Sequence, residues 1–310
     1  MQLHSSPPGS RRAAYAKVTF SVVVWGASFI ATKVALQDVS PVTVVWLRFL
    51  IGVAILGAAV LARSQFALPD RQTGLYFSLL GFLGITFHQW LQSTGLETAQ
   101  ASTTAWIVAT TPVFIALLGW LFLKERLGLL RVLGILIAGV GVLLVVTRGD
   151  LQGLFSGRSV ASGDLLILIS APNWAVFSVL SRSMLQRHPA ARMMFFVMLT
   201  GWIFTSLLFF VQGGPQEIIR LSAGGWVSIL FLGAACSGLA YVFWYDGLQA
   251  IAATQVGAFL YMEPLVAMVV AALVLDERLA WISALGGGLI LLGVWLVNRV
   301  QTPARDMSEY

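Results

Sequence analysis

Ten apolar runs of about 19 to 24 residues follow one another along the chain, with short polar linkers between them. A helix needs roughly 20 apolar residues to cross the hydrocarbon core of a bilayer, where its backbone satisfies its own hydrogen bonds. The sequence therefore predicts an all-α integral membrane protein with ten transmembrane helices. The runs are 14–36, 42–62, 73–93, 100–122, 129–147, 163–185, 192–212, 222–245, 254–275 and 280–298.

Several other classes of protein are disfavoured. Only 10% of the residues are charged, against 58% hydrophobic ones, which is too apolar for a soluble domain. The runs do not alternate with the period of two that an outer-membrane barrel requires. Basic residues lie singly in the linkers, so we expect no nucleic-acid partner. With Cys236 as the single cysteine, the chain has no internal disulfide, and we expect no metal and no cofactor.

The distribution of basic residues predicts the orientation. If the amino terminus is cytoplasmic and each run crosses once, the cytoplasmic side carries most of the arginine and lysine, as the positive-inside rule requires. The first run follows Arg11 and Arg12 and is too long for the apolar core of a signal peptide, so we interpret it as an uncleaved helix. Both termini are then cytoplasmic. The cytoplasmic set is Arg11, Arg12, Lys17, Arg63, Arg71, Lys124, Arg126, Arg131, Arg182, Arg187, Arg192, Arg299 and Arg305, and the opposite set is Arg148, Arg158, Arg220 and Arg278.

The chain contains an internal repeat. A shift of 152 positions places Glu125-Arg126-Leu127 on Glu277-Arg278-Leu279 and Pro112 on Pro264, and a slightly smaller shift places Trp25 on Trp174. The repeat unit is thus five helices, with one copy in residues 1–149 and the other in 150–310. Because five is odd, the second copy enters the membrane from the opposite side. Inverted repeats of this kind are typical of secondary transporters.

The motifs resemble those of the ten-helix EamA family in the drug/metabolite transporter superfamily. They are Trp25-Gly26-Ala27-Ser28-Phe29, Thr111-Pro112-Val113 with Leu123-Lys124-Glu125-Arg126-Leu127, and Glu263-Pro264-Leu265 with Asp276-Glu277-Arg278-Leu279. The resemblance covers nearly the whole chain. It implies a central cavity, gates at both membrane faces and frequent roles in the export of amino acids and related metabolites.

Polar residues within the runs are candidates for solute contact, because unpartnered polar groups are costly in lipid. Gly81, Ile85, His88 and Gln92 share one helical face, a small-to-polar stripe that suits an aqueous cavity. His88 is interpreted either as a solute-binding or proton-exchanging group or as a packing residue between helices.

Aromatic residues at helical spacing predict an aromatic-walled cavity for a hydrophobic or aromatic amino acid. For any single aromatic residue, packing or interfacial anchoring is the alternative. The expected lining residues are Trp25, His88, Gln92, Trp106, Asn173, Trp174, Phe177, Tyr241, Tyr245 and Glu263. Glu263, near mid-membrane, is interpreted as a proton or amino-group site or as a structural carboxyl group.

The remaining charges suggest gates or anchors. Lys33 is interpreted as a gate or carboxylate partner, or as a side chain that snorkels to headgroups, and for Arg48 snorkelling is favoured. Gating or ion-pair candidates at the helix ends are Glu125, Arg126, Glu277 and Arg278. The glycine-rich runs 129–147 and 280–298 are expected to pack against runs 100–122 and 254–275 or against a second copy, which gives a monomer or weak homodimer.

The leading hypothesis is a secondary transporter that exports small amphipathic metabolites by alternating access, with aromatic amino acids as the first substrate class. Abundant arginine, alanine and glycine beside little lysine suggest a GC-rich bacterium and thus its inner membrane. The expected partners are a small solute and membrane lipids, with proton coupling left open. Sugar, nucleotide-sugar or multidrug transport and a channel remain alternatives. An intramembrane enzyme is disfavoured, because the chain lacks His-Glu-x-x-His. The lack of a phosphate-binding Gly-x-x-x-x-Gly-Lys loop argues against an ATP-driven pump.

Overall fold

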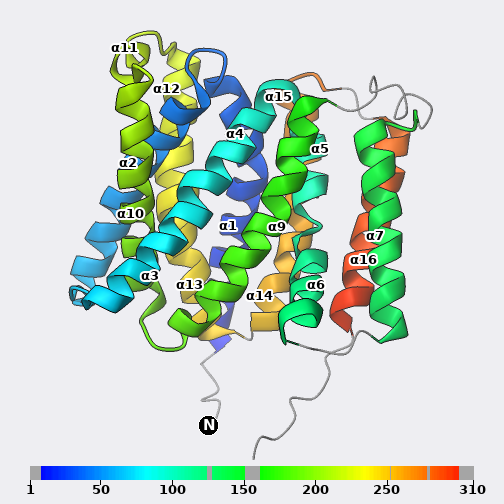
Figure 1. Cartoon of the computed structure of the whole chain (residues 1–310), viewed down its shortest axis with the longest axis horizontal. Coiled ribbons are helices and arrows are strands. Elements are labelled where there is room, and N and C mark those ends of the chain that lie inside the picture. The colour runs from blue at the N-terminus through cyan, green and yellow to red at the C-terminus, as the bar shows by residue number, and fades with distance from the viewer. Residues whose placement is uncertain (1–7, 124–127, 151–160, 252, 278–279, 300–310) are drawn as a thin grey trace, which may run out of the picture.

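The computed structural model describes residues 8–123, 128–150, 161–251, 253–277 and 280–299 (Figure 1). These residues form helices and no β-strand, which confirms the all-α prediction. In chain order the helices are α1 (Pro8–Ala35), α2 (Pro41–Ala62), α3 (Arg71–Gly81), α4 (His88–Thr98), α5 (Ala101–Val108), α6 (Thr111–Leu123), α7 (Leu129–Thr147), α9 (Ser162–Leu185), α10 (Ala190–Val211), α11 (Gly214–Ile218), α12 (Ala223–Leu230), α13 (Ala240–Ala250), α14 (Ala253–Phe259), α15 (Glu263–Val274) and α16 (Trp281–Arg299).

Nine helical stretches of the described chain are long and apolar enough to cross a membrane. They are Arg11–Ala35, Pro41–Ala62, Ala101–Phe122, Leu129–Thr147, Ser162–Leu185, Ala190–Val211, Ala223–Ala250, Gln255–Val274 and Trp281–Asn298. The tenth predicted segment, 73–93, lies in a continuous helical stretch from Arg71 to Thr98. That stretch is less apolar than the nine, because α4 brings polar residues such as His88, Gln89 and Gln92 into it.

Two of the predicted continuous helices are broken in the middle. The run 100–122 is interrupted between α5 and α6, just before Pro112, and the run 254–275 passes through a short 3-10 turn, Leu260–Met262, before Pro264. A proline ring cannot donate a backbone hydrogen bond and suits the first turn of a helix. At the first break the hydroxyl groups of Thr110 and Thr111 donate to the carbonyl oxygens of Ile107 and Val108, at 2.6 and 2.7 Å, which satisfies two acceptors there.

Two π-helical segments, Phe82–Phe87 and Phe231–Leu239, lie within otherwise α-helical stretches. A π-helical segment shifts the angular register of all residues that follow it, and such segments are frequent at functional sites. The first one separates Gly81 from His88. Gly81 and Ile85 face Gly201 of α10 rather than a cavity, so the predicted small-to-polar stripe from Gly81 to Gln92 is wrong in its first half.

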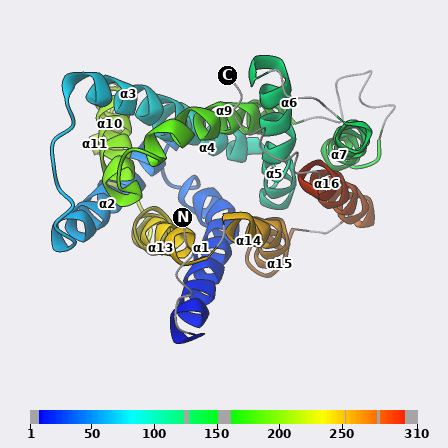
Figure 2. The same cartoon turned by 90° about the horizontal axis from the view of Figure 1, so that it is seen from below.

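Helices from the two halves of the chain pack on one another throughout the bundle. α1 packs against α13 and α15, α2 against α10 and the segment Phe231–Leu239, and α4 against α9. Seen along the helices, α7 and α16 form a pair at one end of the molecule and α2 and α10 lie at the other (Figure 2). The interior between these pairs is therefore built from both halves.

The glycine-rich helices α7 and α16 pack mainly on each other, not on the helices α5, α6, α14 and α15 as expected. A Cβ atom at Gly134 would lie 2.6 Å from the carbonyl oxygen of Gly293, and one at Gly141 would lie 2.6 Å from that of Gly286. Glycine is needed at these positions because the two backbones approach so closely. Large apolar side chains such as Leu136 and Leu273 point outward, as expected for a surface in lipid.

Candidate functional site

The first group of interior aromatic residues joins α1 to α13. The ring of Trp25 lies 5.4 Å from that of Tyr241 and 5.1 Å from that of Trp244, measured between centroids. Its indole Nε1 donates to the carbonyl oxygen of Cys236 at 3.0 Å. This bond uses a backbone acceptor in the π-helical segment, where the regular ladder is disturbed. The arrangement fixes the Trp25 ring while leaving it only partly buried.

The second aromatic group joins α4 to α9. The buried imidazole of His88 lies 4.7 Å from the ring of Trp174, which lies 4.7 Å from the ring of Phe177. Asn173, beside Trp174, donates through Nδ2 to the carbonyl oxygen of Leu83 at 2.9 Å, within the first π-helical segment. Nδ1 of His88 is buried and has no hydrogen-bond partner among the described residues. An unsatisfied buried polar atom is costly unless a ligand or a water molecule meets it.

Arg48 of α2 is hydrogen-bonded to residues next to both aromatic groups, and its guanidinium carbon lies 5.1 Å from the centroid of the Phe49 ring. Arg48 is only 7% exposed. Nε donates to the hydroxyl oxygen of Ser237 at 3.1 Å, and Nη1 donates to Oε1 of Gln89 at 3.0 Å. Ser237 adjoins Cys236, the acceptor of Trp25, and Gln89 adjoins His88. The expectation that Arg48 snorkels to the headgroups is therefore wrong, because its guanidinium group is held in the interior.

Most of the other predicted lining residues lie near the two aromatic groups. Phe177, Tyr241 and Tyr245 belong to one buried cluster, against which Trp25 and Trp174 also pack. Gln92 is buried on α4, one turn beyond His88.

Glu263 and Trp106 complete the predicted lining set. Half-buried Glu263 begins α15, and its backbone carbonyl oxygen is close to Gly26 of α1. Trp106 lies elsewhere. Its ring packs against Gly287, in the cluster that joins α5 to α7 and α16.

Lys33 and Glu277 hold the junction between α4 and α5, at the end of the bundle opposite the amino terminus, which we call the upper end (Figure 1). Nζ of Lys33 donates to the carbonyl oxygens of Leu96 and Ala99. Oε1 of Glu277 accepts from the amide of Ala101 at 2.8 Å. A cation thus lies at the last carbonyl groups of α4 and an anion at the first amide groups of α5, where the helix dipoles favour each charge.

Ser102 completes the contact of Glu277. Oε2 accepts from the Ser102 amide at 3.2 Å and from its hydroxyl group at 2.6 Å. The residue that precedes α5, Gln100, makes no side-chain capping bond. Glu277 therefore takes the place of an N-cap for α5 although it follows α15, and the bond couples the two helices.

Two further carboxylates, Asp38 and Glu217, join helices of the two halves at the upper end of the bundle. Oδ2 of Asp38 accepts from the amide and the hydroxyl group of Ser222, at 2.9 and 2.7 Å, before α12. Oε2 of Glu217 accepts from the amide and the hydroxyl group of Ser40, at 2.9 and 2.7 Å, before α2. Burial raises the pKa of Glu217, but hydrogen bonds from Thr43 and Ser40 outweigh it and bring the pKa below its ordinary value. Glu217 is thus held in its charged form.

The lower end of the bundle, on the side of the amino terminus, is joined by one acidic residue. Asp246 of α13 pairs with Nζ of Lys17 at 2.6 Å through Oδ2 and with Nη1 of Arg63 at 2.9 Å through Oδ1. The three residues connect α13 to the start of α1 and the end of α2. Both ends of the bundle therefore carry polar ties between the two halves of the chain.

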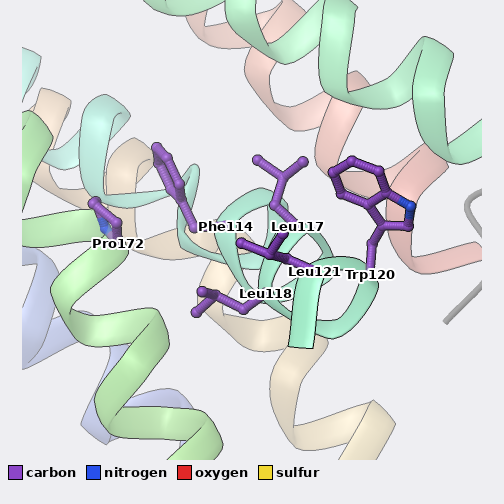
Figure 3. A pocket seen from close by; sticks show the side chains of 6 residues that line it. All are labelled: Phe114, Leu117, Leu118, Trp120, Leu121 and Pro172. Carbon is purple, nitrogen blue, oxygen red and sulfur yellow. The ribbon is translucent and has the colours of Figure 1, made fainter. Parts of the chain in front are cut away.

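An apolar groove lies between α6 and α9, away from these polar groups (Figure 3). Its lining residues are Phe114, Leu117, Leu118, Trp120, Leu121 and Pro172. No carboxyl, amine or hydroxyl side chain reaches it, so it offers no group that would orient a polar solute. We interpret it as part of the apolar surface that faces lipid.

Glu125, Arg126 and Arg278 lie outside the described residues, so their predicted gating role stays a prediction. Sequence reasoning missed the capping roles of Asp38 and Glu217. Their signal is a serine just before an apolar run, at Ser40 and Ser222, which marks a helix start. The partner that bonds each serine from another helix is not visible in such a local pattern.

Known proteins resemble this chain in sequence. Residues 13–147 and 161–299 match the model of the EamA-like transporter family. An uncharacterized transporter of Archaeoglobus fulgidus is 28% identical over 284 residues, which cover 92% of this chain and 96% of the relative. The uncharacterized transporter YdfC of Bacillus subtilis is 30% identical over 273 residues, with coverages of 87% and 86%.

Two further comparisons bear on the function and the fold. A probable amino-acid metabolite efflux pump of Salmonella typhimurium is 27% identical over 288 residues, which cover 89% of this chain and 91% of the pump. A solved crystal structure matches 95% of this chain and 98% of its own with a TM-score of 0.62 and 21% identity. At that identity the structure shows a shared fold.

Proposed function

Because the chain belongs to the EamA-like transporter family, and is thus a multi-pass membrane transporter, we propose that it exports small amphipathic metabolites across a bacterial inner membrane. Amino acids with hydrophobic or aromatic side chains are the first substrate class. The observation that carries this proposal is the two interior aromatic pairs, Trp25 with Tyr241 and His88 with Trp174, each built from both halves of the chain. Arg48 is hydrogen-bonded to Ser237 and Gln89, next to these two pairs. The name of the Salmonella relative, a probable amino-acid metabolite efflux pump, supports the same substrate class.

We propose a topology of ten membrane-spanning helices in two inverted repeats, with both termini cytoplasmic. The stretch from Arg71 to Thr98 is then the additional spanning helix. Local irregularities at corresponding positions support the repeat: each half has a π-helical segment, at Phe82–Phe87 and Phe231–Leu239, and a helix break before Pro112 or Pro264. In this topology the upper end faces the periplasm.

Alternating access would proceed by exchange of the ties at the two ends. The upper ties of Glu277, Asp38 and Glu217 and the lower tie of Asp246 each join helices from different halves. Opening one end requires its hydrogen bonds to be broken and solvated, while the interior site stays between the halves. Such rocking of one repeat against the other is the usual transport motion of inverted-repeat proteins.

Transport could be coupled to a proton gradient through a titratable group in the interior. We propose Glu263 as the first candidate for a proton carrier, since it is a half-buried carboxylic acid within the apolar stretch Gln255–Val274, close to Gly26 of α1. His88 is the second candidate, because its Nδ1 is free of protein partners in the described structure. Beyond solute and lipid no partner is proposed, and the oligomeric state is a monomer or a weak homodimer.

Counterflow in proteoliposomes tests the function. The purified chain would be reconstituted, and uptake of radiolabelled phenylalanine, tryptophan, threonine and a hexose would be measured against an excess of the same unlabelled solute inside. We expect saturable exchange of phenylalanine and tryptophan. Exchange of the hexose alone would contradict amino-acid export, and flux that does not saturate would favour a channel. Protein-free liposomes are the control.

A further inference from the structure

Arg48 carries a buried charge that its protein neighbours do not fully satisfy. The guanidinium group has five N–H donors, and the hydrogen bonds to Ser237 and Gln89 use one on Nε and one on Nη1. Nη2 makes no hydrogen bond among the described residues, although the guanidinium carbon lies 5.1 Å from the centroid of the Phe49 ring. The two donors of Nη2 are free to bind a further acceptor.

No carboxylate of the described chain lies within 4.0 Å of Arg48. Asp246, which forms ion pairs with Lys17 and Arg63, lies at the lower end of the bundle. A buried charge without a counter-charge costs several kcal/mol even after relaxation, and charges retained within a membrane mark solute or ion pathways. An anionic group from outside the protein would offset this cost.

We propose that Arg48 is the carboxylate-binding residue of the interior site, so that the exported solutes carry an anionic group. This inference rests on the proposed transport function and narrows its substrate class. The planar guanidinium group binds carboxylates through two parallel hydrogen bonds, which a single amine does not provide.

The surroundings of Arg48 fit an amphipathic acid. Its partner Gln89 adjoins His88, whose ring contacts Trp174, and its partner Ser237 adjoins Cys236, which binds Trp25. The guanidinium group is thus bonded next to both aromatic groups, the rings of His88 and Trp174 and the ring of Trp25, and its carbon atom lies 5.1 Å from the centroid of the Phe49 ring. A carboxylate bound by Arg48 would leave the rest of the solute against these rings, and aromatic contact suits a hydrophobic side chain.

The alternative role of Arg48 is structural, as a tie between α2, α4 and the segment Phe231–Leu239. The two roles differ in their prediction for solutes without a carboxylate. A purely structural arginine does not distinguish an amino acid from its amide, whereas a carboxylate-binding arginine does.

The test is competition against counterflow of labelled phenylalanine and labelled threonine. Competitors are each amino acid, its carboxamide and, for phenylalanine, 3-phenylpropionate. In the parent we expect the concentration for half-maximal inhibition to be about tenfold or more lower for the acids than for the amides. This factor corresponds to the free energy of hydrogen bonds with a charged partner.

Gln89→Glu is the decisive variant, because it places a carboxylate 3.0 Å from Nη1 of Arg48 and pairs the buried charge internally. We expect the acids to lose about tenfold in apparent affinity, while the amides stay within about twofold. Gln186→Glu, the same change at an exposed position after α9, is the matched control and should alter neither. Arg48→Met should abolish the preference for acids, and Gln89→Glu keeps the test valid if that variant does not fold.

The results of these competition measurements distinguish a failure of the role of Arg48 from a failure of the proposed transport function. If the parent exchanges amino acids but their amides compete equally well, the inference is wrong and the transport function stands. If Gln89→Glu keeps the full preference for acids, the inference is wrong as well. If the parent exchanges only uncharged solutes, both the proposed substrate class and the role of Arg48 are overturned.

Discussion

Replacing Glu277 by glutamine is expected to loosen the upper end of the bundle. Oε1 of Glu277 accepts one hydrogen bond from Ala101, and Oε2 accepts two from Ser102. An amide has one acceptor oxygen, and its NH₂ group would face an N–H or O–H donor at the other position. The variant therefore loses the charge and the bonds of one oxygen. At this partial exposure the loss is about 1 to 2 kcal/mol.

This energy corresponds to a shift of about five- to thirtyfold toward the open upper end, if the closed form dominates in the parent. The assay is the rate at which a membrane-impermeant thiol reagent labels a reporter cysteine from the periplasmic face. Gln92→Cys serves as the reporter because Gln92 is buried on α4 below this junction, and Cys236→Ser removes the native thiol.

Asp276→Asn is the matched control for Glu277→Gln. It removes a charge from the adjacent, exposed position, whose side chain makes no described hydrogen bond. We expect its labelling rate to equal that of the parent. Equal rates for Glu277→Gln and the parent would show that the bonds of Glu277 do not hold the upper end closed, and so would an equal increase in both variants.

Three further outcomes are expected. Gly287→Ala should destabilise the protein by about 1 to 3 kcal/mol by overpacking, because a Cβ atom there would lie 2.5 Å from the Trp106 ring. A Cβ atom at Gly288 would meet open space, so Gly288→Ala should not destabilise the protein. Thermal melting of the two variants in detergent tests this difference. Asp246→Asn breaks both ion pairs of the lower end, each worth about 0 to 1 kcal/mol at this exposure, so cytoplasmic-side labelling of the same reporter should rise about threefold. Glu263→Gln should flatten the pH dependence of exchange; an unchanged profile excludes Glu263 as the proton carrier.

Much of the helical architecture can be predicted from the sequence, because length and apolarity are local properties. The helix breaks are harder to place. Pro112 and Pro264 were visible, but prolines within membrane helices are often accommodated without a break, and Pro172 lies inside the continuous helix α9. The π-helical segment before His88 has no clear signature in the sequence, and it invalidates helical-wheel reasoning across it.

The site depends on contacts between distant parts of the chain, which a local pattern does not contain. Trp25 and Trp174 were predicted together from the repeat, and both pack against one cluster. Arg48 was misinterpreted because its two hydrogen-bond partners lie 41 and 189 residues away. Trp106 has the spacing expected of a lining residue, yet its ring packs on α16, since a helix face alone does not say which neighbour it meets.

The most direct test of the central claim, that solute binds at the interior aromatic site, is phenylalanine counterflow in Trp174→Ala and His88→Ala beside Trp120→Ala. Trp174 and His88 contact each other in the interior, whereas Trp120 is 50% exposed on α6 and serves as the matched control. We expect the concentration for half-maximal exchange to rise about tenfold or more in the first two variants, because aromatic contact with the solute is lost, and to be unchanged in the third. Equal exchange in all three variants, or an equal loss in all three, would contradict the claim.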